Sequence, residues 1–141
     1  MTIEDPFSRY KNYLETLTAA KVSALPGYVS PAVLFSDPFH DVEGVAAMVG
    51  VFDRLFQTVS HVQFIVLDHA FDGQLVFFRW RLTGRLSGKD WEVEGVTHLT
   101  FDDAGLVLSH REYWDAAAQL YELFPVIGPL LRYFRGRIAG G

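Results

Sequence analysis

The chain has 141 residues and a formal net charge of −5, because 17 Asp and Glu outnumber 12 Lys and Arg. One domain of this length can bury a single sizeable core, and the negative charge disfavours nucleic acid and anionic membranes as partners. The sequence contains no cysteine and shows neither a signal peptide nor an apolar run near the roughly 18 residues of a membrane span, so we expect a soluble cytoplasmic protein without disulfides.

The first third of the chain shows helical periodicity. Asp5 followed by Pro6 is a typical helix start, with a capping side chain and proline at the first helical position. Apolar residues then recur every three or four positions, which predicts an amphipathic helix over residues 6–21. A short irregular helix is expected over 22–29, where Pro and Gly interrupt the pattern, and a longer helix over 43–58.

From residue 61 the apolar period changes from about 3.6 to two, which indicates strands. Four strands are predicted, at 61–70, 75–86, 90–101 and 106–115. The turns between them are short and rich in Gly, Asp and Ser, so neighbouring strands should be antiparallel.

Helical patterns return after the strands, at 116–124 and at 130–138. Helices followed by a strand meander predict an α+β fold, with helices on one face of a curved antiparallel sheet. We expect one domain over residues 1–141, in which residues 116–141 form a helical extension. The apolar side of residues 125–138 could close a pocket as a lid or pack against a second subunit.

Alternation along the strands separates two faces of the sheet. Symmetric turns would place Trp80 opposite Thr97 and Gly95 opposite Glu112. The mainly apolar face, which should meet the helices, carries Trp80, Leu82, Gly84, Val93, Gly95, Thr97, Leu99, His110, Glu112 and Trp114. The other face alternates arginines with acids and should contact solvent or another subunit.

Two polar residues of the apolar face need an explanation. His110 and Glu112 point inward in this assignment, and a carboxylate among apolar groups is costly unless it is neutralised or paired. The two side chains could form a structural pair with each other, or they could line a functional pocket. Gly95 would leave space beside the carboxyl group.

This order of helices and strands resembles the nuclear-transport-factor-2-like superfamily over about residues 6–115. That superfamily has a cone-shaped α+β fold and includes ketosteroid isomerases, SnoaL-like polyketide cyclases, limonene epoxide hydrolases and scytalone dehydratase. The resemblance implies a pocket between the sheet and the helices.

Two residues carry the resemblance to ketosteroid isomerase, and a third position departs from it. Asp37, in the segment FSDP, resembles the general-base aspartate of that family, and Tyr13 falls where the family places an oxyanion-stabilising tyrosine. Thr97 stands where the family has a protonated aspartate, and its hydroxyl could donate one hydrogen bond. Asp37 could equally be a turn residue before Pro38, and Tyr13 a core aromatic.

The segment HREYWD, residues 110–115, resembles a motif of limonene epoxide hydrolase. The resemblance places Glu112 at the position of the acid that activates water. The Arg-x-Asp pair of that family is replaced here by Arg79-Trp80-Arg81.

Together these patterns predict a cofactor-independent enzyme that performs acid–base chemistry on a small apolar molecule. The catalytic candidates are Asp37, Glu112, His110 and Tyr13, and the ligand-binding candidates are Trp80, Leu82, Gly95, Thr97, Trp114 and Phe56. No metal is expected, because the five histidines show no ligand spacing. The alternative is a non-catalytic ligand-binding or dimerisation module on the same fold. In either case we expect a homodimer.

Overall fold

A curved sheet of six strands and a layer of helices make up the computed structural model, which describes residues 4–120 and 127–140. The elements along the chain are α1 (Pro6–Glu15), the 3₁₀ helix η1 (Ala19–Gly27), β1 (Val29–Ser36), β2 (Asp41–Glu43), α2 (Val45–Thr58), β3 (Val59–Asp72), β4 (Leu75–Leu86), β5 (Lys89–Phe101), β6 (Val107–Tyr113), α3 (Ala116–Gln119) and α4 (Ile127–Ile138). The strands lie in the order β2-β1-β6-β5-β4-β3.

The helix start at Asp5-Pro6 is confirmed. The Asp5 carboxylate accepts a hydrogen bond of 2.9 Å from the backbone N–H of Ser8, and Pro6 is the first helical residue. The helix ends at Glu15, six residues earlier than the sequence pattern predicts. Thr16 leaves helical geometry and Thr18 is extended. Both residues are threonines, and β-branched residues with a side-chain hydroxyl favour non-helical conformations. The chain then continues as η1.

The four predicted strands correspond to β3 to β6, and the helix predicted at 43–58 to α2. The expected faces are confirmed, but both registers differ from the prediction by two residues. Trp80 pairs with Gly95, and Thr97 with Glu112. The turn between β4 and β5 consists of Ser87 and Gly88 alone, both with positive φ, as in the two-residue turns that match the twist of a hairpin. A shift of two residues preserves the face of every side chain.

Two strands, β1 and β2, were not predicted from the sequence. Pro31 weakens the strand pattern of β1, since proline cannot donate to a ladder. In the structure it lies in an irregular stretch between Val29 and Leu34, where the pairing with β6 is interrupted. β1 is parallel to β6, so the expected antiparallel sheet is in fact mixed at this one pair.

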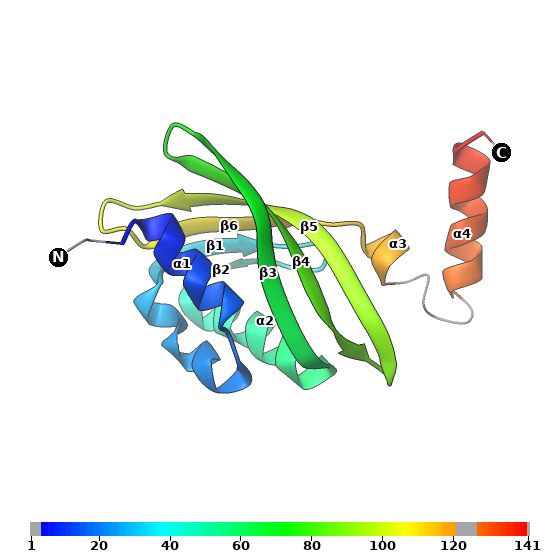
Figure 1. Cartoon of the computed structure of the whole chain (residues 1–141), viewed down its shortest axis with the longest axis horizontal. Helices are drawn as coiled ribbons and strands as arrows, with labels where there is room; N and C mark the ends of the chain where they lie inside the picture. Colours follow the sequence, from blue (N-terminus) through cyan, green and yellow to red (C-terminus); the bar gives the residue numbers. More distant parts are fainter. Residues whose placement is uncertain (1–3, 121–126, 141) are drawn as a thin grey trace.

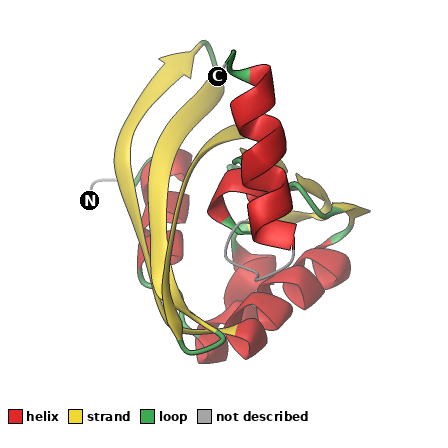
Figure 2. Cartoon of the chain, turned by 90° about the vertical axis from the view of Figure 1, so that its right-hand side faces the viewer, coloured by secondary structure: helices red, strands yellow, loops and turns green. Residues whose placement is uncertain are grey.

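The sheet curls around α1, η1 and α2, which lie on its concave side (Figures 1 and 2). Aromatic and aliphatic side chains from both layers form one core, in which Leu25, Val33 and Leu99 are fully buried. The inward assignment of Trp80 and His110 is confirmed, since these residues are 3% and 1% exposed.

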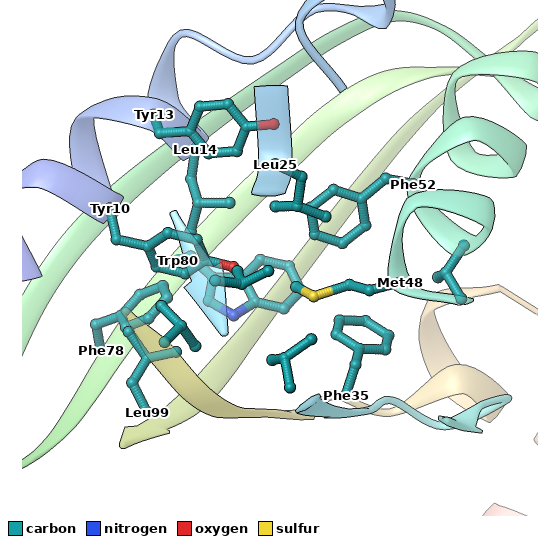
Figure 3. Close-up of a cluster of buried hydrophobic side chains, with 14 of the residues drawn as sticks. Tyr10, Tyr13, Leu14, Leu25, Phe35, Met48, Phe52, Phe78, Trp80 and Leu99 are labelled. Carbon is teal, nitrogen blue, oxygen red and sulfur yellow. The ribbon is translucent and has the colours of Figure 1, made fainter. Parts of the chain in front are cut away.

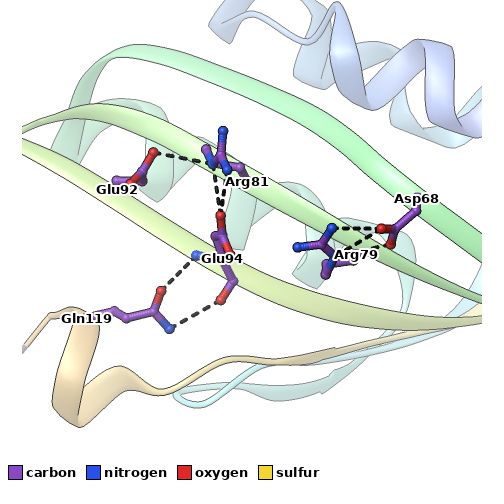
Figure 4. A network of polar contacts seen from close by, with 6 residues as sticks. All are labelled: Asp68, Arg79, Arg81, Glu92, Glu94 and Gln119. Atoms are coloured by element: carbon purple, nitrogen blue, oxygen red, sulfur yellow. Dashed lines mark hydrogen bonds and ion pairs between the residues drawn. The ribbon is translucent and has the colours of Figure 1, made fainter.

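Ion pairs cover the opposite, convex face of the sheet, as the alternation of arginines and acids predicts (Figure 4). Arg79 on β4 binds the Asp68 carboxylate of β3 at 2.7 Å, and Arg81 binds Glu94 of β5 at 2.8 Å. All four side chains are substantially exposed, so each pair contributes little to stability.

The C-terminal part forms α3 and α4, and α4 lies apart from α1 and α2 (Figure 1). Both elements agree with the predicted helical patterns, although residues 121–124 of the first pattern lie outside the described residues. Several large apolar side chains of α4 are exposed, among them Leu130, Tyr133 and Phe134. No helix in the described ranges has the length and apolar character needed to cross a bilayer.

Candidate functional site

A cavity of about 650 Å³ lies between the concave face of the sheet and the helices. Its volume falls in the range of small-molecule sites. The wall is mostly aromatic and aliphatic, with Phe35, Phe52, Phe56, Phe64, Trp80, Trp91 and Trp114 among its residues. Figure 3 shows Phe35 and Phe52 approaching one another from β1 and α2.

A histidine–carboxylate pair on β6 forms part of the wall, and its histidine is almost fully buried. His110 Nε2 lies 2.9 Å from Glu112 Oε1, and the side chains are 2% and 19% exposed. Residues two apart on a strand share a face, so alternation alone brings them together. Because Phe35 of β1 pairs with His110 in the sheet, the strand that carries the pair is held on both sides.

Tyr10 of α1 binds the other nitrogen of this histidine. Its hydroxyl lies 2.8 Å from His110 Nδ1, and the residue is 1% exposed. Burial raises the pKa of the Tyr10 hydroxyl well above its usual value, and the nearby negative charge of Glu112 raises it further. The phenol therefore stays protonated at neutral pH.

Asp37 also lines the cavity, but its carboxylate is engaged in a turn between β1 and β2. Oδ1 accepts hydrogen bonds of 2.8 Å from the backbone N–H groups of Phe39 and His40. The His40 ring lies 2.9 Å from the same oxygen and also lines the cavity. Asp37 is therefore both a turn residue and a residue of the cavity wall.

The parallel pairing of β1 with β6 brings the two predicted acids to one end of the sheet. Ser36 pairs with Arg111, so Asp37 and Glu112 are the next residues on adjacent strands. Both line the cavity.

The predicted ligand-binding residues divide into two groups. Phe56, Trp80, Leu82 and Trp114 line the cavity, whereas Gly95 and Thr97 do not. The Thr97 hydroxyl accepts a hydrogen bond from the Trp80 indole, and the Trp80 ring occupies the space beside Gly95.

Tyr13 is not brought to the cavity wall. Its hydroxyl donates a 2.9 Å hydrogen bond to the backbone carbonyl of Lys21, and its ring stacks on Tyr28. Burial raises the pKa of Tyr13 to about 12. These contacts fit the core-aromatic interpretation.

Tyr10 was not among the residues predicted for the site, although it lies on the buried stripe of α1. A buried tyrosine hydroxyl normally has a partner, which is the available signal. That partner is 100 residues away in the chain, so only the fold identifies it.

In the ranges 4–120 and 127–140, no cluster of three or more His, Asp or Glu side chains is arranged to hold a metal ion. The chemistry that the wall itself offers is proton transfer. The wall carries three carboxylates, two imidazoles and one guanidinium among mostly apolar side chains: Glu15, Asp37, Glu112, His40, His110 and Arg54.

A helix layer in the hollow of a curved sheet, with an apolar cavity between them, defines the cone-shaped nuclear-transport-factor-2-like class of α+β proteins. Within this class, the chain belongs to the SnoaL-like domain family, whose model matches residues 10–110. None of the curated proteins matches the sequence.

Solved structures with this fold carry several names. A protein named as a SnoaL-like polyketide cyclase from Jannaschia sp. CCS1 is 21% identical, with 87% of this chain and 89% of that chain covered and a TM-score of 0.68. An epoxide hydrolase of the limonene type from Mycobacterium tuberculosis is 13% identical, with 96% and 94% covered and a TM-score of 0.65. A protein with a ketosteroid-isomerase-like fold from Catenulispora acidiphila, in complex with trimethylamine, is 15% identical, with 84% and 92% covered and a TM-score of 0.71. At these identities the likeness concerns the fold.

Proposed function

We propose that this protein is a cofactor-independent enzyme that transfers a proton on a small, largely apolar substrate held in the cavity. The observation that carries the proposal is the state of the Glu112 carboxylate. Oε1 is bound to His110, while Oε2 has no hydrogen-bond partner among the residues that the structure describes. Glu112 itself lines the cavity. A positioned acid or base of this kind typically accelerates a reaction by about 10² to 10⁴.

In this mechanism Glu112 Oε2 removes a proton from a carbon or a water molecule and returns it elsewhere on the substrate. Isomerisation, dehydration, cyclisation and hydration all require such a transfer. The wall of aromatic and aliphatic side chains favours an apolar molecule and excludes water, which strengthens electrostatic interactions inside the cavity. The Asp37–His40 pair is a second group that could exchange a proton.

A developing negative charge on the substrate requires a hydrogen-bond donor. The indole N–H groups of Trp80 and Trp91 are engaged with Thr97 and with the backbone of Gln119. Trp114 lines the same cavity, and its N–H has no partner in the described part of the chain. We propose that the indole N–H of Trp114 donates a hydrogen bond to an oxygen of the substrate.

The test uses NMR in D₂O to measure how fast the protein exchanges the α-hydrogens of small cyclic ketones and enones for deuterium. Glu112→Gln should abolish exchange above the uncatalysed rate while the protein stays folded, because the amide oxygen still accepts from His110. Asp37→Asn should reduce it less, and Trp114→Phe should raise KM or lower kcat. Glu94→Gln, on the convex face, is the matched control and should leave exchange unchanged.

A non-catalytic ligand-binding module is the second candidate, because an apolar cavity of this volume binds ligands without chemistry. It predicts that an apolar fluorescent probe binds the wild type and Glu112→Gln equally, and that no compound of the panel exchanges faster with protein than without. That combined result would remove the enzyme proposal.

We also propose that two copies associate, since α4 exposes Leu130, Phe134 and Ile138 at 54%, 53% and 86%. Apolar side chains gathered on one helix are typical of a contact surface. Light scattering should give twice the chain mass for the whole protein. Removal of residues 127–141 should give the monomer mass if α4 forms the contact, and should leave the dimer intact if α4 instead serves as a lid.

A further inference from the structure

The hydrogen bonds around His110 form a buried chain of three residues. The Tyr10 hydroxyl lies 2.8 Å from Nδ1, and Glu112 Oε1 lies 2.9 Å from Nε2. The three residues come from α1 and β6. His110 and Glu112 line the cavity, and Glu112 is the more exposed of the two. The Tyr10 hydroxyl has no other hydrogen-bond partner in residues 4–120 and 127–140.

The protons of this chain can be arranged in a limited number of ways. If His110 carries one proton, on Nε2, the Tyr10 hydroxyl donates to Nδ1 and the Nε2–H donates to Glu112. Every polar hydrogen then has an acceptor. If Nδ1 carries a proton, in the other tautomer or in the imidazolium, it must donate to the Tyr10 oxygen. The hydroxyl hydrogen of Tyr10 is then left buried without an acceptor, which is unfavourable.

The carboxyl group of Glu112 can hold a proton on Oε2 without disturbing this arrangement. Oε1 accepts from Nε2–H whether or not a proton sits on Oε2. A proton can therefore enter and leave at Oε2, the oxygen left free for a substrate, while every buried hydrogen bond stays in place.

We propose that Tyr10 is a positioning residue that holds His110 as the neutral Nε2–H tautomer and thereby confines the exchangeable proton of the site to Glu112 Oε2. Tyr10 does not line the cavity, so it acts through His110 and not on the substrate. The consequence for catalysis rests on the proposed function, whereas the state of His110 does not.

Other charged groups face the same cavity and enter its pH dependence. Asp37 and His40 belong to the turn between β1 and β2, Glu15 to α1 and Arg54 to α2. Glu15 accepts a 3.0 Å hydrogen bond from the backbone of Val66. These groups are the same in the wild type and in a Tyr10 variant, so a comparison of the two isolates the effect of the hydroxyl.

The experiment is ¹⁵N NMR of histidine side chains in the whole protein between about pH 5 and pH 9, the range in which histidines titrate. The chain has five histidines, and the His110 signals are identified by single glutamine substitutions of the other four. In the wild type, Nδ1 should remain unprotonated and Nε2 protonated across this range. A wild-type His110 that is an imidazolium or an Nδ1–H tautomer near pH 7 would overturn the proposal.

The Tyr10→Phe variant removes the hydroxyl and keeps the ring. The neutral ring then loses its hydrogen bond at Nδ1, so the imidazolium is no longer at the same disadvantage. The imidazolium should appear at a pH at least one unit higher than in the wild type. Tyr13→Phe is the matched control, because its hydroxyl binds the Lys21 carbonyl, and should leave the His110 spectrum unchanged. Identical His110 spectra in Tyr10→Phe and the wild type would contradict the assigned role.

The pH profile of α-hydrogen exchange gives the second readout. A carboxylate beside an imidazolium is a weaker base, so Tyr10→Phe should lower exchange about tenfold near pH 6 and progressively less at higher pH. If the panel shows no exchange but the His110 spectra behave as expected, the proposed function fails and the role of Tyr10 in fixing the tautomer stands. If Glu112-dependent exchange occurs and its pH profile is unchanged in Tyr10→Phe, the positioning role fails and the proposed function stands.

Discussion

The indole N–H of Trp80 donates a 2.8 Å hydrogen bond to the hydroxyl of Thr97 on the neighbouring strand. Both residues are almost fully buried, at 3% and 1% exposure. This bond orients the Trp80 ring, which forms part of the cavity wall. Thr97 therefore contributes to the pocket from behind, through Trp80.

Thr97→Val should lower the free energy of unfolding by about 1 to 3 kcal/mol, because a buried indole N–H is left without an acceptor. Urea denaturation measures the difference. Thr83→Val, on β4, is the control and should change stability by less than about 0.5 kcal/mol. Equal effects of the two substitutions would show that the Trp80–Thr97 bond contributes nothing.

Gly95→Ala should destabilise the protein by about 1 to 3 kcal/mol through overpacking. A Cβ at Gly95 would lie 2.5 Å from the Trp80 ring and 2.9 Å from the backbone oxygen of Tyr113. Gly27→Ala has nothing within 4 Å and serves as the control. Thermal unfolding of the two variants distinguishes them, and a neutral Gly95→Ala would mean that Trp80 can move aside.

Stability should fall above pH 10 because two buried tyrosines resist ionisation. Burial raises the pKa of Tyr13 to about 12 and holds that of Tyr10 well above the usual value of 10. The unfolded chain releases these protons first, so stability is fully present below pH 10 and is lost as pH rises toward each folded-state pKa. Tyr10→Phe and Tyr13→Phe should each show a shallower alkaline loss in urea titrations at several pH values. Tyr133→Phe, an exposed site, should match the wild type.

Asp5→Ala should cost about 1 kcal/mol, a typical value for removing a helix N-cap. The hydrogen bonds from the Ser8 side chain and backbone hold the pKa of Asp5 below its usual value of 3.8. The contribution is thus present above pH 3.8 and is lost as pH falls through the lower folded-state pKa. Wild type and variant should therefore converge in stability at acidic pH. Glu4→Ala is the neighbouring control, and a constant difference at every pH would contradict this account.

The strands from residue 59 onward could be predicted because one face of each is buried. Burial of one face forces alternation, and alternation identifies both strand and face. It does not distinguish pairings two residues apart, because these keep every side chain on its own face. The two-residue turn at Ser87 and Gly88 decided the first register.

β1 shows the opposite case. Its burial is irregular, and Pro31 interrupts its pairing, so no period marks it as a strand. The position of Asp37 beside Glu112 depends on the parallel pairing of β1 with β6. That pairing is non-local and leaves no signal in either segment alone.

The candidate site was likewise predictable only where its residues lie close together in the sequence. His110 and Glu112 follow from alternation on one strand. Tyr10 depends on the packing of α1 over a sheet whose residues lie far along the chain, and the different partners of Tyr10 and Tyr13 depend on where each hydroxyl ends in the core.

The pairing of β5 with β6 ends at Val96 and Tyr113, and the side-chain amide of Gln119 binds the β5 backbone just beyond it, at Glu94. This amide accepts from the Glu94 N–H at 2.7 Å and donates to the Glu94 carbonyl at 3.2 Å (Figure 4). The Trp91 indole N–H donates to the backbone carbonyl of Gln119. The next residue, Leu120, belongs to the cavity wall, as does Trp91. The position of the segment formed by α3 and Leu120 and the occupancy of the cavity are therefore thermodynamically linked. A ligand that requires Leu120 in place strengthens the attachment of the segment, and any partner that draws the segment away lowers ligand affinity by the same factor.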